Sequence, residues 1–264
     1  RQGELRARQR ADNRLRPHVR SIVWEHKRRY GARRIAVELA ARNQPCSRRR
    51  VGRLMAEMGL VAIQPKSFKP RTTDSRHTLG YSPNLLLEAP PPDGINQLWV
   101  GDLTYVPMVG GHFLYLALLM DLYSRRIVGW ELRGHMKESL VLATLRSAIS
   151  RCGPGPDLIH HTDRGGQYAG KAYRQVLQRA RMRQSMSRAD SCYDNAFMES
   201  CFGTIKTELE MDCYDNERLA QEEISRYLCY YNTRRRHSAL GYLTPEEFEA
   251  MLCPTDDRPI VKKV

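Results

Sequence analysis

The sequence reads LIHHTDRGGQY over residues 158–168 and DNAFMESCFGTIK over residues 194–206, and these two stretches are the most informative in the chain. The first predicts a short apolar strand that ends at Asp163, because the turn after it (164–166) needs residues without steric limits. The second predicts a helix, whose apolar stripe consists of Phe197, Cys201, Ile205 and Glu208 or Leu209. Asn195, Glu199 and Lys206 lie opposite that stripe on a helical wheel, so we expect Glu199 to face away from the core.

A third carboxylate comes from an upstream strand. Asp102 lies at the centre of LWVGDLTYV (98–106), a run that is typical of a buried strand. A charge in such a position is costly unless it binds something. Asp102, Asp163 and Glu199 together predict a site for two Mg²⁺ ions, because hard cations prefer oxygen ligands and leave positions for phosphate and water.

These acids occur in recognisable motifs. Asp102 lies in WxxDxTYV and Asp163 in HxDRGxQY; 35 residues then intervene before Glu199, and Lys206 follows seven positions later. The pattern resembles the DDE signature of retroviral-integrase-like transposases, and above all the OrfB-type transposases of bacterial insertion sequences of the IS-three family. Supporting phrases are DLYSRRIVGW (121–130), DNAFMESCFGTIKTE (194–208) and YNTRRRHSALGYLTP (231–245). The resemblance extends over roughly residues 17–250.

The resemblance implies an insertion-sequence transposase with an RNase H-like catalytic core. In such an enzyme Asp102, Asp163 and Glu199 would be the catalytic residues and the ligands of two Mg²⁺ ions, with Mn²⁺ as a substitute, and Lys206 would contact DNA. The implied reaction is cleavage at the element's ends followed by strand transfer through a circular intermediate, whereas the residue chemistry alone also allows simple hydrolysis. The implied partners are terminal inverted repeats and target DNA, further copies of the chain on DNA, and an OrfA-type protein from an upstream reading frame.

The charge of the chain is concentrated at its front. Of the 264 residues, 1–80 carry 21 Lys and Arg against 6 Asp and Glu, a net +15, whereas 81–264 carry 22 against 23. This asymmetry indicates a polyanion partner, and nucleic acid is favoured over a membrane because no amphipathic anchor accompanies the charge. The alternative interpretation is a solvated basic surface.

Membrane and metal alternatives have little support in the sequence. The apolar run 113–120 is far too short to span a bilayer, and no signal peptide precedes the first basic segment. Seven cysteines without a CxxC pair predict reduced thiols in a cytoplasmic, nucleoid-associated protein. A zinc site built from His160, His161, Cys192 and Cys201 is disfavoured because the usual ligand spacing is absent.

The front of the chain predicts a small all-α domain of the helix-turn-helix type at residues 17–60. Residues 1–16 lack apolar periodicity and predict a basic arm, whereas 17–60 contain three helical patterns. Ser47 is a suitable N-cap for the third helix, which presents Arg48, Arg49, Arg50 and Arg53 outward and ends at Gly59. We expect this helix to enter the major groove; the alternative is a basic hairpin that touches only phosphates. Residues 61–97 hold six of the fourteen prolines and predict a linker.

Residues 98–212 predict the catalytic core. Strands at 98–106, 112–121 and 126–132 have short connections and must be antiparallel. A helix at 138–152, with Val141, Leu145, Ala148 and Cys152 on one face, gives a crossover long enough for the strand ending at Asp163 to lie parallel to the first. The prediction is a mixed-sheet α/β core that is retroviral integrase-like, with Asp102 beside Asp163 and a loop at 187–191 near the substrate.

The last part of the chain predicts a helical extension at 213–252 and a disordered tail at 253–264. A helix at 217–233 turns Leu219, Ile224, Leu228 and Tyr231 inward. Arg234, Arg235 and Arg236 follow it, either to grip DNA phosphates or to complement the helix dipole. Thr244 opens a capping box for a final short helix.

Some residues and functions compete with this interpretation. Asp121 is expected to cap a turn, Asp194 to cap the Glu199 helix, and His161 to be a hydrogen-bonded strand residue rather than part of the site. For Lys206 the alternative is a solvated surface residue. The rival functions are an RNase H-type or junction-type nuclease, which would not need a sequence-reading module, and a DNA-binding regulator, which would need only residues 17–60.

Overall fold

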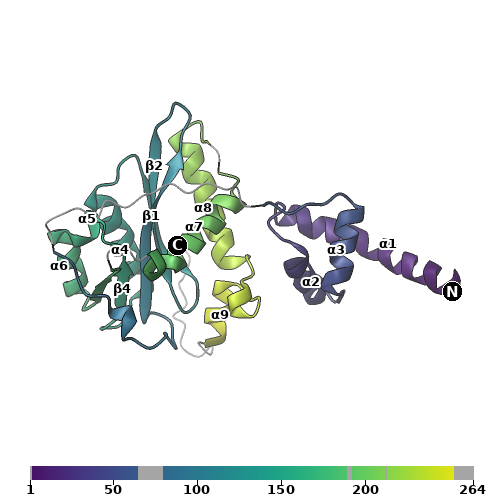
Figure 1. Ribbon diagram of the computed structural model, residues 1–264, viewed down its shortest axis with the longest axis horizontal. Helices are drawn as coiled ribbons and strands as arrows, with labels where there is room; N and C mark the ends of the chain where they lie inside the picture. The colour runs from purple at the N-terminus through teal and green to yellow at the C-terminus, as the bar shows by residue number, and fades with distance from the viewer. Residues whose placement is uncertain (1, 65–79, 189–191, 212, 253–264) are drawn as a thin grey trace, which may run out of the picture. The chain divides into compact units, whose positions relative to one another are not determined.

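The structure, a computed structural model, describes residues 2–64, 80–188, 192–211 and 213–252 (Figure 1). The chain divides into two compact units, Arg1–Lys66 and Ser67–Val264. Much of the expected linker, part of the expected 187–191 loop and the expected disordered tail lie outside the described residues.

The first unit packs three helices: α1 (Gln2–Glu25), α2 (Ala32–Ala41) and α3 (Arg48–Glu57). Their common core consists of Leu15, Val19, Ile22, Val23, Tyr30, Ile35, Leu39, Val51, Leu54 and Met55. The Ser47 hydroxyl accepts a hydrogen bond from the Arg50 amide at 3.3 Å, so the predicted N-cap of the third helix is confirmed.

The expected basic arm is instead part of α1, which begins at Gln2. The sequence between Glu4 and Arg16 is made largely of Ala, Leu, Arg and Gln, which favour helix. Buried Asp12 provides a tertiary anchor because it accepts hydrogen bonds from Arg50 Nε at 2.7 Å and Arg53 Nη2 at 2.6 Å. Apolar periodicity misses this part of the helix because its anchor is polar.

The second unit is built on one five-stranded sheet in the order β3-β2-β1-β4-β5. Its strands are β1 (Leu98–Pro107), β2 (Phe113–Asp121), β3 (Ile127–Arg133), β4 (Ile159–Thr162) and β5 (Arg183–Met186). The first three strands are antiparallel, and β4 pairs parallel with both β1 and β5. The predicted directions of the first four strands are confirmed; β5 was not expected.

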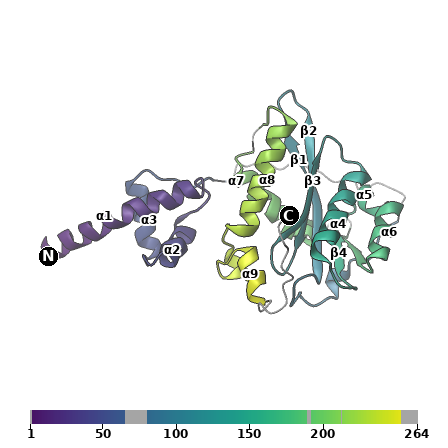
Figure 2. The same ribbon diagram turned by 180° about the vertical axis from the view of Figure 1, so that it is seen from behind.

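Helices cover both faces of this sheet (Figures 1 and 2). On one face lie α4 (Glu138–Cys152), α5 (Gly166–Ala169) and α6 (Lys171–Arg179). On the other lie α7 (Ala196–Glu208) and α8 (Glu217–Thr233), and α9 (Pro245–Leu252) packs against α8. Side chains alternate along β1 between the two cores: Leu98 and Val100 join the α7 and α8 side, whereas Trp99 and Leu103 join the α4 side.

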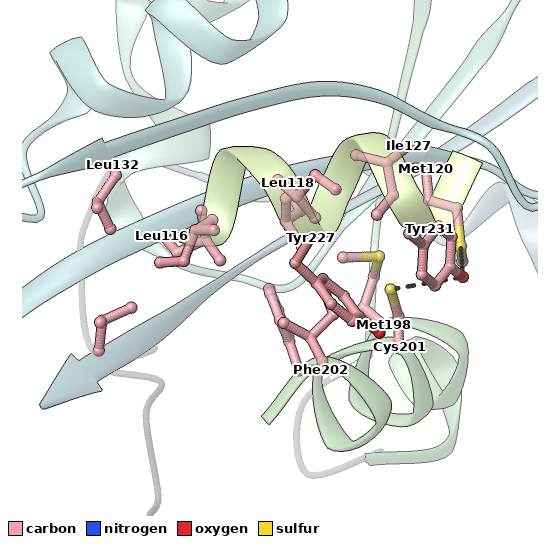
Figure 3. Packing of buried hydrophobic residues seen from close by; sticks show 14 of the residues in the cluster. Leu116, Leu118, Met120, Ile127, Leu132, Met198, Cys201, Phe202, Tyr227 and Tyr231 are labelled. Carbon is pink, nitrogen blue, oxygen red and sulfur yellow. Dashed lines mark hydrogen bonds between the residues drawn. The ribbon is translucent and has the colours of Figure 1, made fainter. Parts of the chain in front are cut away.

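The core between the sheet and helices α7 and α8 shows that the predicted apolar stripe of α7 was partly wrong (Figure 3). The buried residues of α7 are Met198, Cys201, Phe202, Ile205 and Glu208. Phe197, which we expected in the stripe, is 44% exposed. A stripe spaced i, i+3, i+4, i+7 follows the 3.6-residue helical period better than one spaced i, i+4, i+8, so Met198 and Phe202 take the inward positions. Leu219 of α8 is likewise exposed rather than inward.

The predicted capping box of α9 is confirmed. The Thr244 amide donates to Glu247 Oε2 at 2.8 Å, and the Glu247 amide donates to Thr244 Oγ1 at 3.1 Å. Short 3-10 helices connect other elements: η1 (Leu85–Leu87), η2 (Cys192–Asn195) and η3 (Ser238–Leu240). None of the helices that the structure describes is both long and apolar enough to cross a lipid bilayer.

Candidate active site

Two of the three predicted acids lie on neighbouring parallel strands: Asp102 within β1 and Asp163 directly after β4. The last paired position of β1 and β4 joins Gly101 to Thr162. Asp102 and Asp163 each come one residue after that pair. Because parallel strands run in register, the two carboxylates start from adjacent points of the sheet.

Glu199 comes from α7, which packs on the sheet through Met198, Phe202 and Ile205. Glu199 itself is exposed, as expected for a position away from that buried face. Lys206 lies on α7 seven residues later and is half-buried. The sheet and one flanking helix thus contribute all three acids and the lysine.

The electrostatics of Asp102 connect these four side chains. Burial raises the pKa of Asp102 well above its usual range, and the negative charges of Asp163 and Glu199 raise it further. The amide of Leu103, which donates to Asp102 Oδ1 at 2.7 Å, and the Lys206 ammonium group act in the opposite direction. Asp102 therefore lies within electrostatic reach of Asp163, Glu199 and Lys206.

Neighbouring groups respond to the same charges. Burial lowers the pKa of Lys206, while the charge of Asp102 partly opposes this shift. Burial, Asp163 and Asp102 together raise the pKa of Tyr168 well above its usual range. Asp163 Oδ1 accepts a hydrogen bond from the Gly165 amide at 2.9 Å, which fixes the carboxylate at the start of the turn. Tyr168 lies in the HxDRGxQY motif, but nothing in the sequence indicated its proximity to both acids.

The chemistry of this group fits divalent cations better than any other ligand class. Three carboxylates that repel one another supply oxygen ligands, and a cation between them would relieve the repulsion that raises the pKa of Asp102. Among the residues that the structure describes, no three His, Cys, Asp or Glu side chains converge closely enough to enclose a metal ion. The other two acids are thus close enough to affect the pKa of Asp102, but the three side chains do not surround a common metal position.

Asp121 is part of a turn. Its Oδ1 accepts hydrogen bonds from the Tyr123 amide at 3.0 Å and the Ser124 amide at 2.8 Å, and its Oδ2 accepts one from the Asn96 amide at 2.7 Å. The predicted turn-capping role of Asp121 is confirmed.

Asp194 does not cap the Glu199 helix as expected. The N-cap of α7 is Asn195, whose side chain makes no capping hydrogen bond. Asn195 was expected to face outward but is 92% buried, since only 8% of its surface is exposed. The Asp194 carboxylate instead accepts from Asn84 Nδ2 at 2.8 Å and from the Arg188 amide at 2.9 Å. Asp194 therefore joins η2 to two other segments.

Both strand histidines are buried. His161 Nδ1 lies 2.8 Å from Ser185 Oγ and its Nε2 lies 3.2 Å from Ser187 Oγ, so the predicted hydrogen-bonded strand histidine is confirmed. Burial lowers the pKa of His161 to about 4. His160 Nε2 lies 2.7 Å from the Tyr173 hydroxyl, and burial lowers the pKa of His160 to about 3.

These histidines predict a loss of stability in acid. In the unfolded chain His161 becomes protonated below its ordinary pKa of 6.5. In the folded chain it stays neutral until the pH falls to about 4. Stability is therefore complete above about pH 6.5 and falls as the pH drops. Between pH 7 and 5 the free energy of unfolding should fall by about 2 kcal/mol more in the wild type than in His161→Gln. Denaturant unfolding at both pH values measures this difference, and an equal fall in the two proteins would contradict the assignment.

Some of the arginines that we expected on DNA are exposed, whereas others are bound by groups of the protein itself. Arg48 and Arg49 are exposed on α3, whereas Arg50 and Arg53 are bound to Asp12. Arg234 is also exposed, and Arg236 Nη1 donates to the Tyr242 carbonyl oxygen at 3.0 Å.

Arg235 corrects the expectation of a phosphate contact. It is only 5% exposed, and its Nη2 donates to Glu208 Oε1 at 2.8 Å. The Tyr227 hydroxyl donates to the other oxygen of Glu208 at 3.0 Å. Burial acts to lower the pKa of Arg235, but the charge of Glu208 raises it, so Arg235 keeps its positive charge. Sequence alone could not reveal this because the partner lies 27 positions away.

Comparison with known proteins gives a consistent result. The chain matches the family described as Integrase core domain over residues 92–192 and again over 180–245, and the family described as HTH-like domain over residues 10–68. It is 39% identical to the transposase for insertion sequence element IS904 of Lactococcus lactis, covering 88% of this chain and 91% of the relative. It is also 39% identical to the transposase InsF for insertion sequence IS3A of Escherichia coli, covering 89% of this chain and 83% of the relative.

A solved structure shares the fold. The chain aligns with one from the simian T-cell lymphotropic virus intasome in complex with PP2A regulatory subunit B56 gamma, with a TM-score of 0.52 and 16% identity. The alignment covers 87% of this chain and 75% of that chain. The expected integrase-like RNase H fold with a mixed sheet, preceded by an HTH-like domain, is confirmed.

Proposed function

Because the chain belongs to the IS-three family of insertion-sequence transposases, which carry an integrase core domain, we propose that it cuts and joins DNA strands with Asp102, Asp163 and Glu199. The observation that carries the proposal is the position of Asp102 and Asp163, each one residue after the last paired position of β1 and β4. Burial raises the pKa of Asp102, and the charges of Asp163 and Glu199 raise it further. Three carboxylates brought together at such a cost to the folded state are best explained by a cationic ligand.

The proposed reaction is in-line displacement at phosphorus without a covalent enzyme intermediate. Divalent cations bound by the three acids, Mg²⁺ or Mn²⁺, would activate the attacking oxygen and stabilise the leaving oxygen. Asp102 and Asp163 hold their ligand atoms on the sheet, where hydrogen bonds from Leu103 and Gly165 orient them. Lys206 places a positive charge beside Asp102, where it can contact a DNA phosphate.

The two attacking groups needed are water and a DNA 3′-hydroxyl. Attack by water cuts a strand and frees a 3′-hydroxyl, which then attacks a second phosphate at the same acids. Joining element ends to a target requires more than one end at a time, which favours several copies of the chain on DNA. Membership of the family favours strand transfer through a circular intermediate. An OrfA-type partner and the domain boundaries given above remain predictions.

For the first unit we propose binding to the terminal inverted repeats through α3. Arg48 and Arg49 are exposed at the start of this helix, where the match to an HTH-like domain favours entry into the major groove. The same match favours a transposase over a nuclease without sequence preference.

The direct test of the proposed function is a strand-transfer assay. The full chain is incubated with Mg²⁺ and DNA that carries the ends of the parent element, and cut and joined strands are resolved by electrophoresis. Joined products that require Mg²⁺ support the proposal. Cutting without joining would favour the nuclease instead.

Binding to end DNA is expected to weaken in the double variant Arg48→Ala and Arg49→Ala. Each arginine that neutralises a phosphate releases counterions, so the variant should bind more weakly and its salt dependence should fall by about two counterions. Anisotropy titrations over a range of salt concentrations measure both effects. A matched control removes two exposed arginines of the second unit, Arg146 and Arg179. Equal weakening in the control would show that total charge, rather than α3, governs binding.

A further inference from the structure

An aromatic side chain on a segment outside the sheet contacts Arg164, the residue that follows Asp163. Tyr81 precedes β1 by many residues, yet the residues on either side of it form hydrogen bonds to α6 and β5. Arg174 Nη2 donates to the Gly80 carbonyl oxygen at 2.8 Å. Ser82 Oγ donates to Gln184 Oε1, in β5, at 2.9 Å. The position of Tyr81 is therefore set by α6 and β5.

The ring of Tyr81 lies against a guanidinium group. The Cζ atom of Arg164 is 4.6 Å from the centroid of the ring. Arg164 is itself fixed, because its Nε donates to the Ser187 carbonyl oxygen at 2.7 Å. Tyr81 is nevertheless 40% exposed. The result is a fixed cation–π pair that still presents aromatic surface to solvent.

The pair formed by Tyr81 and Arg164 lies beyond the carboxyl ends of β4 and β5. Arg164 directly follows Asp163 and comes two residues after the end of β4. Ser187 directly follows the end of β5, which pairs parallel with β4. The carboxyl ends of parallel strands are where ligands of α/β sheets bind. A molecule held at Asp163 is therefore within reach of the Tyr81 and Arg164 pair.

We propose that Tyr81, supported by Arg164, stacks on an unpaired base of the DNA strand held at Asp163. The inference rests on the proposed function, since it needs DNA at the three acids. Every base offers a flat π-face, so stacking on an aromatic ring tolerates any sequence. Stacking on this ring requires that a base near the reacting phosphate has separated from its partner. Arg164 supplies positive charge for the neighbouring phosphate in the same contact.

The test measures DNA binding without catalysis. The full chain is titrated, with Ca²⁺ in place of Mg²⁺, into fluorescent end DNA that carries either a short single-stranded overhang or a blunt terminus. Tyr81→Leu should bind the overhang DNA about tenfold more weakly than the wild type and the blunt DNA equally well. Tyr81→Phe should match the wild type because stacking does not need the hydroxyl. Phe113→Leu, which changes a ring of similar exposure (45%) at the start of β2, should also match it.

The outcomes separate this inference from the function on which it rests. Equal affinity of the wild type and Tyr81→Leu for overhang DNA would overturn the stacking role and leave the proposed function intact. An equal loss in Tyr81→Phe and Tyr81→Leu would overturn it in favour of a hydroxyl contact, and equal weakening on both DNAs would place Tyr81 on the duplex. Failure of the wild type to bind any end DNA would overturn the proposed function itself.

Discussion

The variants Asp102→Asn, Asp163→Asn and Glu199→Gln are each expected to lose DNA cleavage and strand transfer together, by at least about a hundredfold. Each substitution removes one ligand charge while keeping nearly the same shape, so the fold should survive. One group of acids performs both steps, so neither step should remain when one acid is lost. Binding to end DNA should persist, because the exposed arginines of α3 belong to the other unit.

Matched controls make this expectation specific. Asp157→Asn and Glu210→Gln remove exposed carboxylates of the same unit. Both positions have positive φ, 67° at Asp157 and 48° at Glu210, and Asn is well suited to the first. Strand-transfer and gel-shift assays on all five variants decide the matter. Full activity in Glu199→Gln, or an equal loss in a control variant that remains folded, would mean that the wrong carboxylate has been assigned.

The second large effect concerns stability. Arg235→Met is expected to lower the free energy of unfolding by about 3–5 kcal/mol, because it leaves the buried carboxylate of Glu208 without its cation. The double variant Arg235→Met and Glu208→Leu should recover most of this loss, since it removes both charges and keeps the volume apolar. Urea denaturation measures the free energy of unfolding of the wild type, the single variant and the double variant.

The neighbouring Arg234 provides the control for this prediction. Arg234 is exposed, so Arg234→Met should change the free energy of unfolding by no more than about 0.5 kcal/mol. If Arg235→Met kept full stability and lost affinity for DNA, the phosphate-contact interpretation of Arg235 would be restored.

The elements with a strong apolar signal could be predicted from the sequence. Strands β1 to β3 and helix α4 are defined by long apolar runs or helical periodicity, and their bounds differ from the prediction by a residue or less. Strand β5 could not be predicted in this way because it consists of only four residues, RQSM, of which three are polar. Its place in the sheet comes from pairing with β4.

The acids of the site could be found because each occupies an unusual place in a regular pattern. Asp102 interrupts an apolar strand, Asp163 follows one, and Glu199 faces away from a buried stripe. The surrounding contacts could not be found, since they depend on residues that only the fold brings together. Asn84 and Asp194 are 110 positions apart, and Glu208 and Arg235 are 27 apart.

Thermal denaturation at pH 7 shows whether Asp102, Asp163 and Glu199 form one cation site. The pKa of Asp102 is raised in the folded state, so its ionisation costs stability as the pH rises through that pKa. In EDTA, Asp102→Asn should therefore melt at a higher temperature than the wild type. Millimolar Mg²⁺ should raise the melting temperature of the wild type and leave Asp102→Asn nearly unchanged. An identical response of the two proteins to Mg²⁺ would contradict a shared cation site at these three carboxylates.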